Sequence, residues 1–218
     1  MTGFTGFKSS IQSTPVQRST PAANASQFAL ERVDPIEIRA VIAYPSLVEP
    51  DANAGGKYGA LFLITEVDDQ TALIELRDKV IQQTFRSHQL PAGAHDPLRR
   101  ADERAPNGEY AFKHPAFRVP QAMVIRAKTG YQPKCVWGPA ETPTEAAEIH
   151  GGDHVVVEIG CYGYKNQSRG VGLSLGRIWL IRKGDVRIER GANASAAVRR
   201  IDRSRLQFSA NDADSQAA

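Results

Sequence analysis

Apolar and polar side chains alternate most regularly between residues 150 and 185. This alternation predicts two strands, 153–164 and 171–182, which are joined by a polar, basic turn at 165–170. One face of the first strand is apolar and is expected to face the core; it consists of Val155, Val157, Ile159 and Cys161. The other face consists of His154, Glu158, Tyr162 and Tyr164. Two tyrosines beside a basic turn are typical of a nucleic-acid platform, although an ordinary solvated hairpin has the same pattern.

Shorter apolar segments predict further strands at 37–44, 57–65, 119–128, 133–137 and 186–190. Residues 68–87 instead place apolar side chains at helical spacing, and they predict one amphipathic helix. The apolar positions of this helix are Leu73, Leu76, Val80 and Ile81.

One helix among six or seven short strands is typical of a barrel of the oligonucleotide-binding (OB) type. We therefore expect a mainly β fold, namely a five-stranded Greek-key barrel with one inserted helix at about 68–87 and long loops. A two-sheet sandwich is the competing architecture. Alternating βαβ units do not occur in the predicted order, which counts against a Rossmann-like enzyme.

Composition divides the chain into three parts. Residues 1–34 are rich in Ser, Thr, Ala, Gln and Asn without sustained periodicity, so we expect a flexible N-terminal arm. The predicted strands and helix define one domain over 35–190. Residues 191–218 are rich in Ala and Ser, and we expect them to form a flexible C-terminal tail.

Positive charge is concentrated in two segments, although the whole chain carries a formal charge of only +3. Residues 99–137 hold eight Lys or Arg against three acids, and residues 165–190 hold seven against two. Such segregation favours a surface that binds a polyanion, or a basic face that is merely solvated. Within 88–117, a long irregular region, cations are interleaved with aromatic residues. Cations attract phosphates and rings stack on unpaired bases, so this pattern matches the chemistry of single-stranded nucleic acid. A disordered, solvated loop is the alternative.

The remaining candidate chemistry is weak. Cys135 and Cys161 lie in apolar segments and are expected to be free thiols in a reducing compartment. His150 and His154 have the spacing of helical zinc ligands, but they lie in a predicted loop and strand, where they are on the order of 13 Å apart. No metal and no cofactor is therefore expected. No apolar run has the length of a membrane span or of a signal peptide, so we expect a cytoplasmic protein that makes no membrane contact.

Several short motifs occur in the order seen in the phage T7-type single-stranded DNA-binding proteins, which the sequence resembles over about residues 37–188. They are Tyr44-Pro45, the segment 57–64 (KYGALFLI), the helix, Gly108 with Tyr110, Arg126-Ala127-Lys128, Pro133, Gly151-Gly152-Asp153, and Gly170 through Gly184-Asp185.

The resemblance implies an OB-fold protein of DNA replication and recombination that coats single strands without strong sequence preference. It also implies a homodimer, contacts with a polymerase or helicase, and the cytoplasm of a phage-infected or bacterial host cell. In that family a strongly acidic C-terminal tail ends in an aromatic residue. This chain departs from the pattern, because its end has only Asp212 and Asp214 and Phe208 is not terminal.

We therefore predict a non-catalytic protein that binds single-stranded DNA through stacking and phosphate contacts. The predicted stacking residues are Tyr110, Phe112, Tyr131, Trp137, Tyr162, Tyr164 and Trp179. The predicted phosphate contacts are Arg99, Arg100, Lys113, Arg126, Lys128, Lys134, Lys165, Arg169, Arg182 and Lys183. Packing in the core is the alternative role for Trp137 and Trp179. A protein-binding adaptor barrel is the first alternative function, and a nucleic-acid enzyme such as a nuclease is the second.

Overall fold

The computed structural model describes residues 33–138, 140–166 and 168–189. Apart from residues 33 and 34, the predicted N-terminal arm lies outside these ranges, and so does the predicted tail at 191–218. The described residues cover nearly all of the predicted domain at 35–190.

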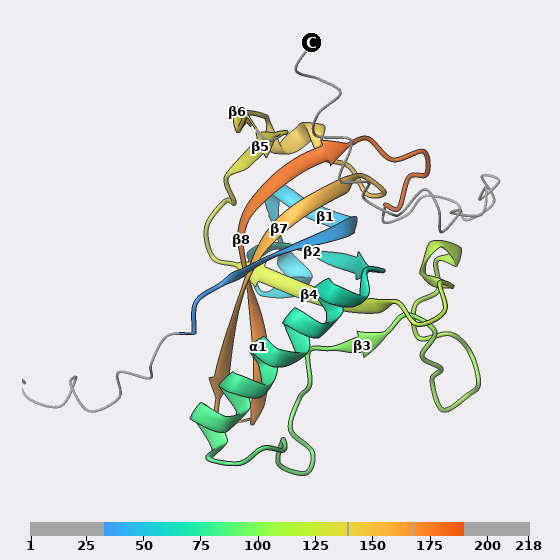
Figure 1. Ribbon diagram of the computed structural model, residues 1–218. Coiled ribbons are helices and arrows are strands. Elements are labelled where there is room, and N and C mark those ends of the chain that lie inside the picture. Colours follow the sequence, from blue (N-terminus) through green and yellow to red (C-terminus); the bar gives the residue numbers. More distant parts are fainter. Residues whose placement is uncertain (1–32, 139, 167, 190–218) are drawn as a thin grey trace, which may run out of the picture. The chain divides into compact units, whose positions relative to one another are not determined.

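Five strands of the described chain form a closed barrel (Figure 1). They are β1 (Ile36–Asp51), β2 (Lys57–Ile64), β4 (Met123–Thr129), β7 (His154–Tyr164) and β8 (Gly170–Arg182). Their order around the barrel is β4-β2-β1-β7-β8, and a parallel pairing of β8 with β4 closes the ring. The other pairings in the ring are antiparallel. This order confirms the predicted OB-type Greek-key barrel.

Short elements extend the barrel at its edges. The additional strands are β3 (Arg99–Arg100), β5 (Cys135–Trp137) and β6 (Thr142–Pro143). The single-turn helices are η1 (Ala52–Ala54), η2 (Pro115–Phe117) and η3 (Ala146–Glu148). β3 pairs with β4. β5 pairs with the edge of β8 that also contacts β4, further towards the C-terminal end of β8.

The alternation of β7 determines which of its side chains enter the core. Val155, Val157 and Ile159 are fully buried in the main cluster, and Cys161 packs partly buried against it. Phe62 and Ile64 of β2 fill the same cluster from the opposite side of the barrel. The predicted core face of the first hairpin strand is confirmed, because a period of two places every second residue on one side of the sheet.

β1 is longer than the predicted strand 37–44. Tyr44 has a φ of 50°, and the register of β1 against β2 shifts between Ala43 and Ser46. Pro45 therefore lies at a bulge, where a missing backbone N–H does not interrupt the ladder. The strand bends at this bulge and continues to Asp51, which brings its second half beside β2.

The segment 186–189 is not a strand, contrary to the expectation for 186–190. Its backbone is instead held at one residue, since Ile188 donates to the Gly151 carbonyl at 2.9 Å and accepts from the Tyr44 N–H at 2.9 Å. A Cβ atom at Gly151 would lie 1.9 Å from the Ile188 carbonyl oxygen, so only glycine permits this approach.

The helix α1 (Val67–Phe85) packs against β7, β1 and β8, beside the tip of the β7–β8 hairpin (Figure 1). Leu73 joins the main core, and Val80 and Ile81 pack with Val171 of β8. The helix ends two residues before the predicted boundary, because Arg86 adopts a left-handed φ of 55° and donates its backbone N–H to the Gln82 carbonyl.

Part of the long region 88–117 is anchored on the outside of the barrel. Phe117 is only 1% exposed and lies in a second cluster with Leu63 of β2 and Val124 of β4. These two strand residues point away from the main core, so η2 and its flanking loop cover this part of the outer surface. The loop therefore borders the part of the outer surface of β2 and β4 that stays uncovered.

Phe117→Ala is expected to lower the free energy of unfolding by about 3–5 kcal/mol, because it removes a fully buried ring and leaves a cavity in the second cluster. Urea denaturation measures this loss, and limited proteolysis should show faster cleavage within 101–119. Tyr131→Ala is the matched control, since Tyr131 is 85% exposed, and it should change stability by less than about 0.5 kcal/mol. An unchanged Phe117→Ala protein would mean that the loop is not held by this ring.

Candidate nucleic-acid interface

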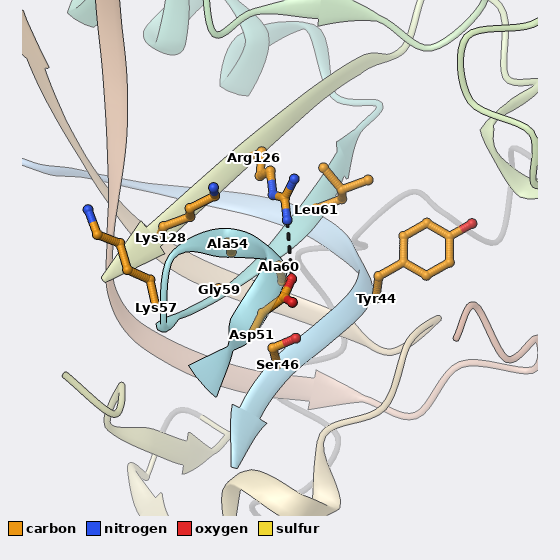
Figure 2. A pocket seen from close by; sticks show the side chains of 10 residues that line it. All are labelled: Tyr44, Ser46, Asp51, Ala54, Lys57, Gly59, Ala60, Leu61, Arg126 and Lys128. Atoms are coloured by element: carbon orange, nitrogen blue, oxygen red, sulfur yellow. Dashed lines mark hydrogen bonds and ion pairs between the residues drawn. The ribbon is translucent and has the colours of Figure 1, made fainter. Parts of the chain in front are cut away.

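A basic pocket lies on the uncovered outer face of β2 and β4. Arg126 and Lys128 point outward because Ile125 and Ala127, which alternate with them, are buried in the core. Lys57 at the start of β2 lies on the same pocket, which is a small hollow of about 80 Å³. Figure 2 shows these three cationic side chains extending from neighbouring strands around one hollow.

One carboxylate accompanies the three cations. Asp51 Oδ2 lies 3.4 Å from Arg126 Nη2 (Figure 2), and its Oδ1 accepts the Asn53 N–H at 3.0 Å. The Asp51 side chain is only 6% exposed, so it is fixed at the end of β1. Within the described ranges, neither Lys57 nor Lys128 forms an ion pair. The pocket therefore retains an excess of positive charge.

This excess of positive charge affects the pKa of Lys128. Burial lowers the pKa of the Lys128 ammonium, and repulsion from Arg126 and Lys57 lowers it further, against a smaller opposing effect of Asp51. A bound anion would relieve this repulsion and favour the charged ammonium. The pocket thus has the electrostatic properties of a site for a phosphate.

Aromatic contacts connect the pocket to the long loop. Tyr44, which lines the pocket, has its ring centroid 6.0 Å from that of Phe117 and 6.5 Å from the His114 ring. Phe112 lies 5.3 Å from Phe117, and the Arg99 guanidinium lies 5.0 Å from the Phe112 ring. Burial lowers the pKa of His114. Phe112 is therefore a half-buried packing residue in this structure, and its predicted role in stacking remains a prediction.

The arginines of β3 are engaged by neighbouring acids. Arg99 donates to both carboxylate oxygens of Glu103, at 2.8 and 2.7 Å, and Arg100 donates to Asp102 at 2.9 and 3.0 Å. The Arg99 guanidinium lowers the pKa of the Glu103 carboxyl, and Arg100 does the same for Asp102. A phosphate would have to compete with these carboxylates, so β3 attracts anions less than the pocket does.

The Tyr110 ring contacts two further arginines, Arg104 and Arg118. The Arg104 guanidinium is 4.1 Å and the Arg118 guanidinium 5.2 Å from the centre of its ring. The Arg104 side chain also donates to the Gly108 carbonyl at 2.8 Å. Lys113, in the same loop, is exposed. This loop therefore exposes cations to solvent, while the Tyr110 ring is already in contact with two arginines.

The tip of the β7–β8 hairpin forms the other border of the outer face. Tyr162 is 49% exposed, and its ring centroid lies 6.4 Å from that of Tyr164. Lys165 and Arg169 are exposed, and the Lys165 ammonium lies 5.3 Å from the Phe85 ring at the end of α1. The Arg169 carbonyl accepts the His95 N–H at 2.9 Å, which fixes the hairpin tip against the long loop.

The remaining predicted residues lie elsewhere. Trp179 donates to Glu141 at 3.3 Å, and Lys183 lies 5.9 Å from the Trp137 ring while it contacts the Glu148 carbonyl and Asp153. Lys134, Trp137, Trp179, Arg182 and Lys183 gather at β5 and the far end of β8. The eleven residues of β7 span roughly 35 Å. These side chains are therefore separated from the hairpin tip by the length of the barrel. Tyr131, which follows β4, is exposed.

A family model described as the ssDNA-binding protein of Enterobacter phage Enc34 matches residues 36–203. The chain belongs to this family. The membership confirms the resemblance to phage single-stranded DNA-binding proteins that the order of motifs predicts. A comparison with curated protein sequences finds no match.

Solved structures of the Enc34 phage protein share the fold. The C-terminally truncated ssDNA-binding protein of bacteriophage Enc34 is 18% identical, with a TM-score of 0.55 over 71% of this chain and 88% of that one. The same phage protein in complex with ssDNA is 19% identical, with a TM-score of 0.54 over 71% and 89%. The crystal structure of gp2.5, the ssDNA-binding protein encoded by bacteriophage T7, is 13% identical, with a TM-score of 0.46 over 70% and 93%.

Sequence patterns did not identify Lys57, Asp51 or Tyr44 as parts of the pocket of this family member. Lys57 precedes a nearly continuous apolar run, which is the pattern of a buried strand. Its alternation with Gly59 and Leu61, both of which line the pocket, was the available signal. Tyr44 is the last residue of the expected first strand, and Asp51 lies beyond its expected end. The bulge therefore concealed the continuation of β1 that brings both residues to the pocket.

In the described ranges, no group of three His, Cys, Asp or Glu side chains is arranged to hold a metal ion. None of the described helices is long and apolar enough to span a membrane. Cys135 and Cys161 are free thiols, and burial raises their pKa values to about 11 and about 12. Both thiols therefore stay protonated at neutral pH, as expected of core residues.

Arg182 is coupled to a buried histidine of β7. Its Nη2 donates to His154 Nε2 at 3.1 Å, a geometry that requires a neutral imidazole. Burial, and then the positive charge of Arg182, lower the pKa of His154 to about 4. Between pH 6.5 and about 4, the unfolded chain therefore binds a proton that the folded protein excludes.

Stability should consequently be complete above pH 6.5 and fall as the pH decreases towards 4, with a slope of up to about 1.4 kcal/mol per pH unit from this residue. Urea denaturation of His154→Gln should show a flatter dependence in this window than the original protein. His88→Gln, at an exposed histidine after α1, is the control and should leave the slope unchanged. Equal slopes for His154→Gln and the original protein would show that His154 is not held neutral.

Proposed function

We propose that this protein binds single-stranded DNA without base specificity and without catalysis. The observation that carries the proposal is the basic pocket of Lys57, Arg126 and Lys128 on the outer face of β2 and β4. OB barrels bind oligonucleotides on the face of their second and third strands, between the loops that join strands one to two and four to five. In this barrel, β2 and β4 are the second and third strands, and the hairpin tip at 165–169 is the loop between the fourth and fifth.

The chemistry of this face suits an unpaired strand. Cations of the pocket and of the hairpin tip bind phosphates, and exposed tyrosine rings stack on bases of any sequence. A duplex conceals its bases in the stack and offers the phosphates alone. The Enc34 phage protein is an ssDNA-binding protein, and one of its solved structures is a complex with ssDNA, which supports the same function here.

Other features of the resemblance belong to the same proposal. We include a homodimer, contacts with a replication polymerase or helicase, and action in the cytoplasm of a phage-infected or bacterial host cell. The resemblance of the sequence to the phage T7-type proteins implies all three. A protein-binding adaptor and a nuclease remain the rival functions, and they differ from DNA binding in measurable ways.

Binding of a fluorescent poly-dT oligonucleotide should be tight at low salt and weaken linearly on a log–log scale, with a slope of about −0.7 per phosphate neutralised. Lys57→Ala and Lys128→Ala should each weaken binding and reduce the magnitude of this slope by about 0.7. Lys79→Ala changes an exposed lysine of α1 and is the matched control, which should retain both affinity and slope.

Each other outcome of this titration identifies a rival. Equal competition by duplex DNA of the same length would indicate a general basic surface. Absence of binding at low salt would contradict the proposal and favour the adaptor. Degradation of the oligonucleotide on addition of Mg²⁺ or Mn²⁺ would favour a nuclease.

Light scattering of the full chain should give a mass twice that of one chain over a range of protein concentrations, because a stable homodimer does not dissociate on moderate dilution. The measurement is repeated in high salt, which weakens contacts between exposed charges. A mass of one chain under both conditions would contradict the homodimer and leave the DNA-binding proposal intact.

A further inference from the structure

The exposed ring of Tyr162 is supported from below by a glycine. Tyr162 of β7 pairs with Gly172 of β8, and a Cβ atom at Gly172 would lie 2.6 Å from Tyr162 Cζ and 2.7 Å from its Oη. The far end of the ring therefore lies directly above the backbone of β8. Because half of the side chain stays exposed, the ring is fixed on one side and open to solvent on the other.

This ring lies next to the basic pocket, across the strands that close the barrel. Ser174 of β8 pairs with Lys128 of β4, and Gly172 precedes Ser174 by two residues on the same face. Strands lie about 4.8 Å apart and rise about 3.3 Å per residue, which places the Gly172 and Lys128 Cα atoms roughly 8 Å apart. One face of β4 and β8 therefore carries both a cation and a ring.

The charges along β7 and β8 favour one direction for an anionic chain that leaves Tyr162. Glu158 lies above Gly176, where an added Cβ would be 2.8 Å from its carboxyl carbon, and it borders the face on the side away from the hairpin tip. Lys165 and Arg169 are exposed at the tip itself. A polyanion is repelled on the first side and attracted on the second.

We propose that Tyr162, supported by Gly172, forms a subsite for one unpaired base of single-stranded DNA, beside the phosphate site of Lys128. Tyr162 contacts the base, and Gly172 is a positioning residue that lets the ring lie across β8. The strand then crosses the outside of the barrel from the pocket to the hairpin tip. This inference rests on the proposed function and adds the location of a base.

Two oligonucleotides of equal length separate base contacts from phosphate contacts, namely poly-dT and the same backbone without bases. Tyr162→Ala should weaken binding of poly-dT by roughly 5- to 150-fold, which is the range for one stacked base. The same change should leave binding of the abasic backbone within about twofold, since only a base can stack. Tyr162→Phe keeps the ring and should bind both oligonucleotides as the original protein does.

Gly172→Ala tests the positioning role. The φ angle of Gly172 is not in the left-handed region, so its backbone accepts alanine. The new methyl group would instead displace the Tyr162 ring. The variant should lose affinity for poly-dT and retain affinity for the abasic backbone. Gly176→Ala is the control, because it adds a methyl group on the same strand and face beneath Glu158 instead. Any effect of a displaced Glu158 carboxylate acts on the phosphates and should be equal for poly-dT and for the abasic backbone.

The outcomes distinguish failure of the subsite from failure of the function. Equal losses on both oligonucleotides, or no loss, for Tyr162→Ala would overturn the subsite while tight binding of the original protein to poly-dT keeps the function. No binding of the original protein would overturn both. Circular dichroism checks that each variant folds, and if Gly172→Ala does not fold, the Tyr162→Ala and Tyr162→Phe pair decides.

Discussion

One register pair in the described chain, Lys128 of β4 with Ser174 of β8, closes the barrel. The pair also determines which side chains lie outside, because neighbours on a strand alternate between its faces. A slip by one residue would turn Lys128 into the core and Ala127 outward. Closure also joins the pocket of β2 and β4 to the β7–β8 hairpin. The fold and the continuity of its basic face therefore depend on the same contact.

Electrostatics distinguishes the pocket from the other cations of the molecule. Arg99 and Arg100 each hold a carboxylate of their own loop, whereas Lys57 and Lys128 share one pocket with Arg126. Exposed ion pairs contribute little to stability, so the pairs of β3 matter chiefly because they reduce the local positive potential. The single acid of the pocket, Asp51, is engaged by Arg126 and by the η1 turn. Repulsion among like charges is thus concentrated where an anion can relieve it.

Features with a short period in the sequence were predictable, and features that depend on distant pairing were not. The core face of β7 and the extent of α1 follow from periods of 2 and 3.6 residues. The bulge at Tyr44 has no such period, so the second half of β1 and Asp51 were missed. Charge alone groups Lys183 with Lys165 in one basic segment, but the two lysines lie at opposite ends of β8. The distance between two such residues increases with the length of the strand that separates them, and the charge pattern does not show it.

Aromatic residues show why composition alone cannot locate a binding surface. Phe112, Tyr110 and Tyr162 all lie among cations in the sequence. In the structure, Phe112 contacts Phe117 and Arg99, and Tyr110 contacts two guanidinium groups. Tyr162 instead lies over the Gly172 backbone and beside the Tyr164 ring, and half of its side chain stays exposed. A ring that other side chains surround is already covered by them, whereas a ring that lies on a glycine backbone retains an exposed side for a base.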